Sequence, residues 1–143
     1  MADDYQALQK ALAAEHAVIW AYGEVGAAVG PDLIAAVTAA DQRHRERRHD
    51  IEQLLIAKAQ EPVASEPAYS LPSPITDQAT AIDVAAQLED AMCAQWRYCL
   101  SRFDSPELRT TFSGYLTEAA VAAYQWRRLT AGVAAATVAF PGA

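Results

Sequence analysis

The sequence has few of the residues that interrupt helices. It contains six glycines and seven prolines in 143 residues. Both residue types destabilise a helix interior, glycine through its conformational entropy and proline through the hydrogen bond that it cannot donate. Alanine, the best helix former, is abundant. This composition favours long uninterrupted helices, and we expect an all-α protein.

Long apolar runs and an excess of positive charge are also missing. No uncharged apolar segment approaches the ~20 residues of a membrane-spanning helix, and residues 1–5 lack the basic flank and apolar run that begin a signal peptide. The formal net charge is −7. Nucleic-acid binding depends on neutralising phosphates, and anionic membrane surfaces also attract basic segments. We therefore expect a cytoplasmic protein with neither a nucleic-acid nor a membrane partner.

Cysteine is scarce, and its spacing excludes a bridge within one helix. Cys93 and Cys99 are six residues apart, which is ~9 Å of axial rise in a helix. The Cα atoms of a disulfide lie within ~7 Å of each other. We expect two reduced thiols in the core of a cytosolic protein.

Apolar residues spaced three and four apart predict four long helices. The expected helices cover about residues 3–28, 32–60, 77–103 and 105–136, with a proline-rich crossover loop at residues 61–76. Sixteen extended residues can span up to ~50 Å, so this loop can return along a helix of ~40 Å. Short, long and short connections predict one domain over residues 1–143, a ferritin-like four-helix bundle with a long crossover between the second and third helices.

Charged residues interrupt the predicted apolar stripes near the middle of the helices. The residues on or beside these stripes at one level are Glu15, Asp41, His44, Arg48, Glu89 and Glu118. Because the chain turns near Gly30, Glu15 is expected to face His44 across the bundle. The remaining arginines of the second helix, Arg43, Arg45 and Arg47, are expected on a solvated face with local ion pairs.

This layer resembles half of a di-iron site. In di-iron bundles two helices each provide a Glu, and the other two each provide a Glu-x-x-His pair. The pair Glu46–His49 falls between the steps of its stripe, whereas Asp41–His44 lies on the stripe. The fourth helix has Glu118, but Val121 stands where the second histidine is needed. We predict that no complete di-iron site forms.

Two interpretations of the layer follow. The first is a metal-free core network in which charge pairing holds Glu15, Asp41, His44, Arg48 and Glu89. Arg48 disfavours a nearby divalent ion, and unpaired buried carboxylates cost several kcal/mol. The second is a single iron, manganese or zinc ion bound by Glu15, Asp41, His44, Glu89 and Glu118. The first predicts a structural or binding protein without catalytic residues or cofactor, and the second a metal-binding protein or metal-dependent oxidoreductase.

Small residues suggest two contact surfaces. A second small apolar stripe on the first helix predicts a homodimer, because it needs cover beyond a one-sided core. Its residues are Ala11, Ala14, Val18, Ala21 and Val25. A binding protein would instead have a pocket near the waist of the bundle, where Ala119 and Ala122 leave room.

Three segments carry a resemblance to a known family: Leu8–Gly23, His44–Arg48 and Glu66–Asp77. Together they are similar to an uncharacterised, actinobacterial-type family of ferritin-like domains, a domain of unknown function. The resemblance extends over nearly the whole chain. It implies the ferritin-like bundle and brings no established activity, substrate or ligand set. The more distant ferritin and bacterioferritin pattern would need a histidine at Val121.

Overall fold

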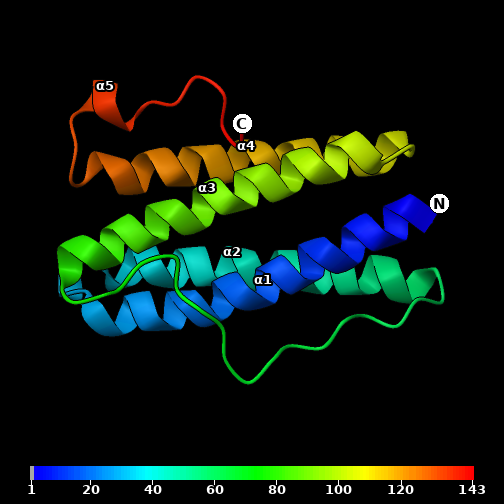
Figure 1. Cartoon of the computed structure of the whole chain (residues 1–143), viewed down its shortest axis with the longest axis horizontal. Helices are drawn as coiled ribbons and strands as arrows, with labels where there is room; N and C mark the ends of the chain where they lie inside the picture. Colours follow the sequence, from blue (N-terminus) through cyan, green and yellow to red (C-terminus); the bar gives the residue numbers. More distant parts are fainter. Residues whose placement is uncertain (1) are drawn as a thin grey trace.

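The computed structural model describes residues 2–143, and these form an all-α bundle (Figure 1). The helices are α1 (Ala2–Ala28), α2 (Pro31–Ala57), α3 (Gln78–Arg102), α4 (Pro106–Arg128) and the single turn α5 (Val133–Ala136). The predicted fold class, all-α, is confirmed. Among the described residues none of the helices combines the length and the hydropathy of a membrane span.

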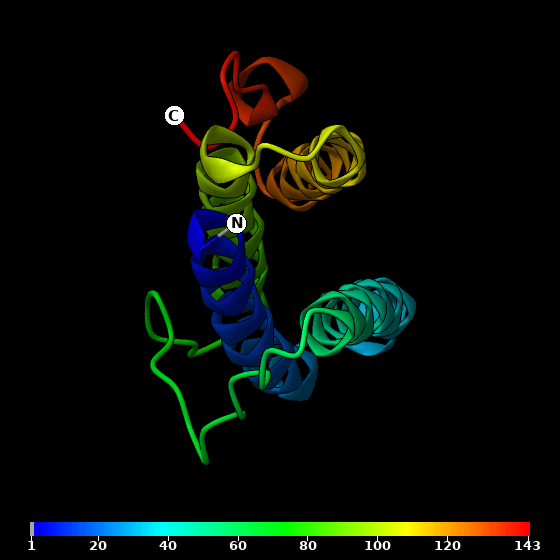
Figure 2. The ribbon, with the colours of Figure 1, turned by 90° about the vertical axis from the view of Figure 1, so that its right-hand side faces the viewer.

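The helices run in two antiparallel pairs, α1 with α2 and α3 with α4 (Figure 1). The connection 58–77 returns along the molecule, so that α3 begins at the end where α2 began. Viewed along the helices, α1 and α3 lie next to each other, with α2 beside α1 and α4 beside α3 (Figure 2). Each of these pairs is in contact, which places α1 and α3 at the centre of the bundle.

Local side-chain chemistry begins the helices where the sequence predicts. Asp77 and Thr80 form a reciprocal capping box at the start of α3. Ser105 accepts a hydrogen bond from the Leu108 amide, and Pro106 occupies the first turn of α4. These caps satisfy amide groups that have no partner inside the helix.

Two helix ends differ from the prediction. The second helix ends at Ala57 and not near residue 60, because Ala59 adopts a left-handed conformation with φ of 56°. The predicted helix 105–136 is divided after Arg128. There the Arg127 side chain donates to the Ala136 carbonyl oxygen at 2.9 Å, which folds α5 back toward α4.

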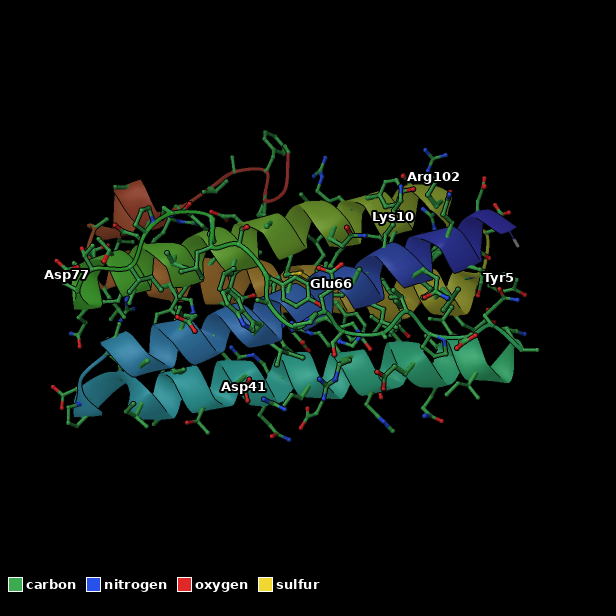
Figure 3. All side chains as sticks on the ribbon, turned by 60° about the horizontal axis from the view of Figure 1, so that its bottom comes forward. Tyr5, Lys10, Asp41, Glu66, Asp77 and Arg102 are labelled. Carbon is green, nitrogen blue, oxygen red and sulfur yellow. The ribbon has the colours of Figure 1, made fainter. Side chains whose placement is uncertain are left out.

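The proline-rich connection packs against α1 (Figure 3). Gln9 donates to the Glu61 carbonyl oxygen at 2.6 Å and accepts from the Val63 amide at 2.8 Å. The ring of Trp20 lies 6.2 Å from that of Tyr69. These contacts hold the connection along one side of the bundle.

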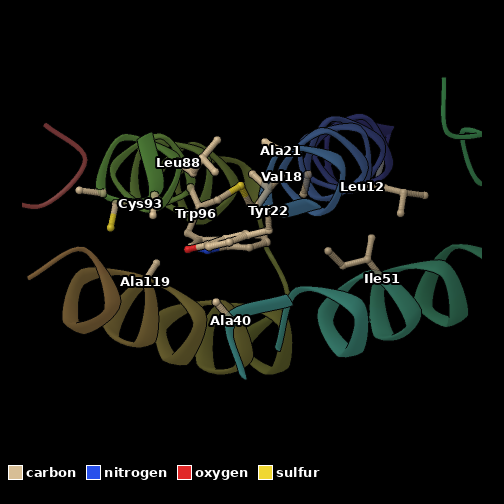
Figure 4. Close-up of a cluster of buried hydrophobic side chains, with 14 of the residues drawn as sticks. Leu12, Val18, Ala21, Tyr22, Ala40, Ile51, Leu88, Cys93, Trp96 and Ala119 are labelled. Carbon is tan, nitrogen blue, oxygen red and sulfur yellow. The ribbon is translucent and has the colours of Figure 1, made fainter. Parts of the chain in front are cut away.

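Large apolar side chains from all four long helices fill the core (Figure 4). The largest fully buried side chains are Trp96, Tyr22, Phe112, Leu12 and Ile51. Cys93 and Cys99 are buried free thiols, as predicted, and burial raises the pKa of each to about 11.

The small apolar stripe of the first helix lies inside the bundle. Ala11, Val18, Ala21 and Val25 are at most 5% exposed, and Ala14 is partly buried against the same core. The helix that carries them packs against both α2 and α3. The chain therefore covers this stripe itself, and the stripe gives no reason for a second copy. The homodimer stays an untested prediction without this support.

Candidate functional site

A histidine on α2 lies between two carboxylates at the centre of the bundle. His44 Nδ1 is 2.6 Å from Glu15 Oε2, and His44 Nε2 is 2.8 Å from Glu89 Oε1. His44 and Glu15 are fully buried, and Glu89 is 1% exposed. The structure therefore brings together three of the residues that the sequence places in one layer, from α1, α2 and α3.

A tyrosine and a tryptophan extend this layer to the fourth helix. Tyr22 donates its hydroxyl to Glu89 Oε1 at 2.6 Å, and Trp126 donates its indole N–H to the Tyr22 oxygen at 3.1 Å. The Tyr22 ring also stacks on His44, with ring centroids 5.5 Å apart. The hydrogen-bonded chain Trp126–Tyr22–Glu89–His44–Glu15 thus connects α4, α1, α3 and α2.

The short contacts indicate that His44 is protonated. Burial lowers the pKa of His44, but the charges and hydrogen bonds of Glu15 and Glu89 outweigh it and raise the pKa to about 9. An imidazolium ring can donate from both nitrogens, which matches a carboxylate oxygen at each. At neutral pH His44 is therefore a cation between two acids, and its hydrogen bonds are charge-assisted.

The two carboxyl groups respond differently to the same surroundings. Burial is the largest influence on Glu15 and raises its pKa above the ordinary value in spite of His44. Burial also opposes ionisation of Glu89, but the hydrogen bonds from His44 and Tyr22 and the charge of His44 lower its pKa. Glu89 accepts two donors on one oxygen, so it is the more firmly ionised of the two acids.

The buried arginine of α2 is Arg47, so the prediction that Arg48 belongs to the core network is wrong. Arg47 is 3% exposed, while Arg48 is only partly buried. Arg47 Nη2 binds Glu118 Oε2 at 2.5 Å, and its guanidinium lies 5.4 Å from the centre of the Tyr115 ring. The arginine expected on the solvated face therefore reaches inward and connects α2 to α4.

The error lies in the phase of the stripe along α2. The buried positions follow the order Val37, Ala40, His44, Arg47, Ile51 and Leu55. Positions 47 and 48 lie roughly 60° and 40° to either side of His44 around the helix, so both are compatible with a stripe through His44. Ala40 carries the signal that could have settled the phase, because it is apolar and Asp41 is not.

Asp41 and Glu118 lie at the edge of the layer. Asp41 (Figure 3) accepts from Arg45 Nε at 2.7 Å, and its side chain is 29% exposed. The side chain of Glu118 is 56% exposed at its contact with Arg47. Asp41 thus belongs to a surface ion pair, and neither carboxylate contacts His44.

The arrangement of donors does not fit a metal ion. Both ring nitrogens of His44 contact carboxylate oxygens, so neither is free as a ligand. Among the described residues, the buried carboxylate oxygens without a protein partner are Glu15 Oε1 and Glu89 Oε2, whereas a zinc site takes about four ligands. The other unpartnered atoms beside them, Arg47 Nε and Nη1, are cationic donors that cannot bind a metal ion. Within residues 2–143 no cluster of three or more His, Cys, Asp or Glu side chains is suited to a metal ion.

The polar layer predicted from the sequence did not include Tyr22 and Trp126. Tyr22 follows Glu15 by seven residues, which is about two helical turns on the same face. That spacing could have indicated from the sequence that Tyr22 lies on the same inward face as Glu15. No spacing indicates the contact between Trp126 and Tyr22, because 104 residues separate them.

A family model described as a domain of unknown function (DUF4439) matches residues 7–143. Among solved structures, a conserved hypothetical protein, rv2844, from Mycobacterium tuberculosis is similar at 34% sequence identity and a TM-score of 0.87. The match covers 90% of this chain and 97% of that chain. No curated protein matches the sequence.

Proposed function

Because the chain belongs to the DUF4439 family, a domain of unknown function, we propose its role from the buried layer itself. We propose a ferritin-like binding protein without catalytic residues, in which a charge network replaces a di-iron site. One observation carries this proposal: carboxylates occupy both nitrogens of His44 at 2.6 and 2.8 Å. The antiparallel helix pairs and the long connection between α2 and α3 support the ferritin-like part.

The charges of the proposed network can balance without a metal. His44 and Arg47 provide two cations beside the buried acids Glu15 and Glu89. The third acid, Glu118, binds Arg47 from the solvent-exposed edge of the layer. Removing one partner from such a buried set costs roughly 3–5 kcal/mol, because it leaves a charge uncompensated. We infer that the layer holds the relative positions of the helices and leaves binding to the surface.

The competing function is a metal-binding protein or a metal-dependent oxidoreductase. Two observations favour it: Glu15 Oε1 and Glu89 Oε2 are buried without a protein partner. For these oxygens to act with His44 in a metal site, at least one of the His44–carboxylate contacts would have to open. The metal content of the protein separates the two functions.

The test is elemental analysis of the full chain, purified without chelator and again after incubation with iron(II), manganese(II) or zinc(II). We expect substoichiometric metal in both cases, with no increase in melting temperature. The variant His44→Gln is the matched control and should have the same metal content with a lower melting temperature. One equivalent of metal in the native chain, lost in His44→Gln, would overturn the proposal.

A further inference from the structure

The surface between α2 and α4 is hollowed. These helices are connected near their middles by the Arg47–Glu118 ion pair and by a hydrogen bond from Tyr115 to Asp50 at 3.3 Å. Toward the start of α2 and the end of α4 a cavity of about 390 Å³ opens between them. Its apolar wall is formed by Leu33, Ala36, Ala39, Ala122, Trp126 and Leu129.

Two arginines line the same cavity. Arg43 comes from α2 and Arg128 from α4, and neither forms an ion pair with any residue from 2 to 143. By contrast, the neighbouring Arg45 is paired with Asp41. The chain as a whole carries a formal charge of −7, yet these two cations beside the apolar cavity have no acidic partner. They are therefore available to bind an anionic ligand.

The shape and the chemistry of the cavity together describe its ligand. Small-molecule pockets are usually apolar, of roughly 300–1,000 Å³, with a few polar groups that orient the ligand. Arginine binds carboxylates through two parallel hydrogen bonds. We propose that this cavity binds an amphipathic carboxylate, with its head at Arg43 and Arg128 and its acyl chain against the apolar wall. This inference rests on the proposed binding role.

Trp126 places the cavity next to the buried layer. Its ring forms part of the cavity wall, and its indole N–H donates to Tyr22, which in turn donates to Glu89. The charge network therefore holds one wall of the ligand site in position. Of the two alanines that the sequence places beside a possible pocket, Ala122 lies in this wall, whereas Ala119 is fully buried in the core.

The experiment titrates dansyl-labelled undecanoate into the full chain and follows dansyl fluorescence. Arg43→Ala and Arg128→Ala should each weaken binding of the probe about tenfold, because each variant lacks one charged hydrogen-bond donor to the carboxylate. Arg45→Ala is the matched control, an exposed arginine on the same helix that is paired outside the cavity. It should leave binding unchanged.

Two further measurements keep the inference falsifiable if an arginine variant misfolds. Ala36→Leu adds volume at an exposed position of the cavity wall and should abolish binding while circular dichroism stays native. Unlabelled dodecanoate should displace the probe, and neutral dodecanol should not. Equal competition by the alcohol, or equal affinity of the Arg43 and Arg45 variants, would overturn carboxylate recognition.

Absence of probe binding to the folded chain would also overturn the inference, including the case in which sedimentation gives a dimer that covers the cavity. That failure differs from failure of the proposed function. Stoichiometric metal with intact probe binding contradicts only the metal-free network. A metal-free protein that does not bind the probe contradicts only the cavity ligand.

Discussion

His44 takes its protonation state from acids on two other helices. Burial alone would favour a neutral ring, yet Glu15 and Glu89 raise the pKa of His44 to about 9. The stability of the bundle should therefore depend on pH between the ordinary pKa of histidine, 6.5, and about 9. Because the pKa of His44 is higher in the folded state than its ordinary value of 6.5, protonation stabilises the fold.

We expect the free energy of unfolding to fall by about 2–3 kcal/mol between pH 6.5 and pH 9. The contribution of His44 to the free energy of unfolding is complete below pH 6.5 and is lost as the pH rises through about 9. The pKa of Glu15 is also raised, so this group too lowers the free energy of unfolding as the pH rises above 4.5. The lowered pKa of Glu89 stabilises the fold above 4.5 and ceases to do so as the pH falls.

Urea unfolding at several pH values measures this dependence, and His44→Gln is the control. The variant has no titrating ring, so its stability should change much less across the same range. Parallel pH profiles for the two proteins would show that His44 does not carry the effect.

Arg47 and Arg48 form a matched pair for a second test. Arg47→Ala removes a buried side chain that binds Glu118 and lies near Glu15 and Glu89. Because Glu118 remains accessible to water, we expect a loss of about 2–3 kcal/mol in the free energy of unfolding. Arg48→Ala should cost less than about 1 kcal/mol. Equal losses in urea unfolding would contradict the inward assignment of Arg47.

At the scale of the helices, local chemistry explains the beginnings better than the ends. Asp77 and Ser105 indicate in the sequence where α3 and α4 begin, because their side chains cap the first turn of each helix. The end of α2 carries no such signal. Ala59 occupies a left-handed conformation that glycine adopts more readily.

This conformation predicts a stabilising substitution. Ala59→Gly should raise the free energy of unfolding by about 1 kcal/mol, since a left-handed conformation costs an L-residue roughly 1–2 kcal/mol. Ala57→Gly, at the last residue of α2, should instead lower it by about 0.5–1 kcal/mol. Thermal denaturation of both variants checks the prediction, and a destabilising Ala59→Gly would contradict it.

In the whole molecule, the four long helices do not pack against equal numbers of neighbours. α1 packs against both α2 and α3, and α3 packs against both α1 and α4. The outer helices α2 and α4 border an open cavity. Among the described residues they are connected by one ion pair, Arg47–Glu118, and by the hydrogen bond from Tyr115 to Asp50. The central pair should therefore be the most stable part of the bundle.

Native-state hydrogen exchange should show this order directly. Amides in the middle turns of α1 and α3 are expected to exchange through global unfolding, and those of α2 and α4 faster through partial opening. Mass spectrometry of peptides from each helix gives the comparison within one sample. Uniform protection of all four helices would contradict the unequal packing.

The sequence by itself determined the all-α class, the approximate helices and the level of the polar layer. Helical periodicity places Glu15, His44 and Glu89 on inward faces, and the turn near Gly30 sets the first two at one height. These features follow from local propensity and from the 3.6-residue repeat.

Only the tertiary structure decided which neighbours these residues meet. It placed Arg47 and not Arg48 in the interior, because the position of α4 selects one of two phases compatible with the α2 stripe. It also covered the small residues of α1 with α3 and joined Trp126 to Tyr22 across 104 residues. The repeat of one helix defines a face, but packing against other helices decides how far that face extends and what it contacts.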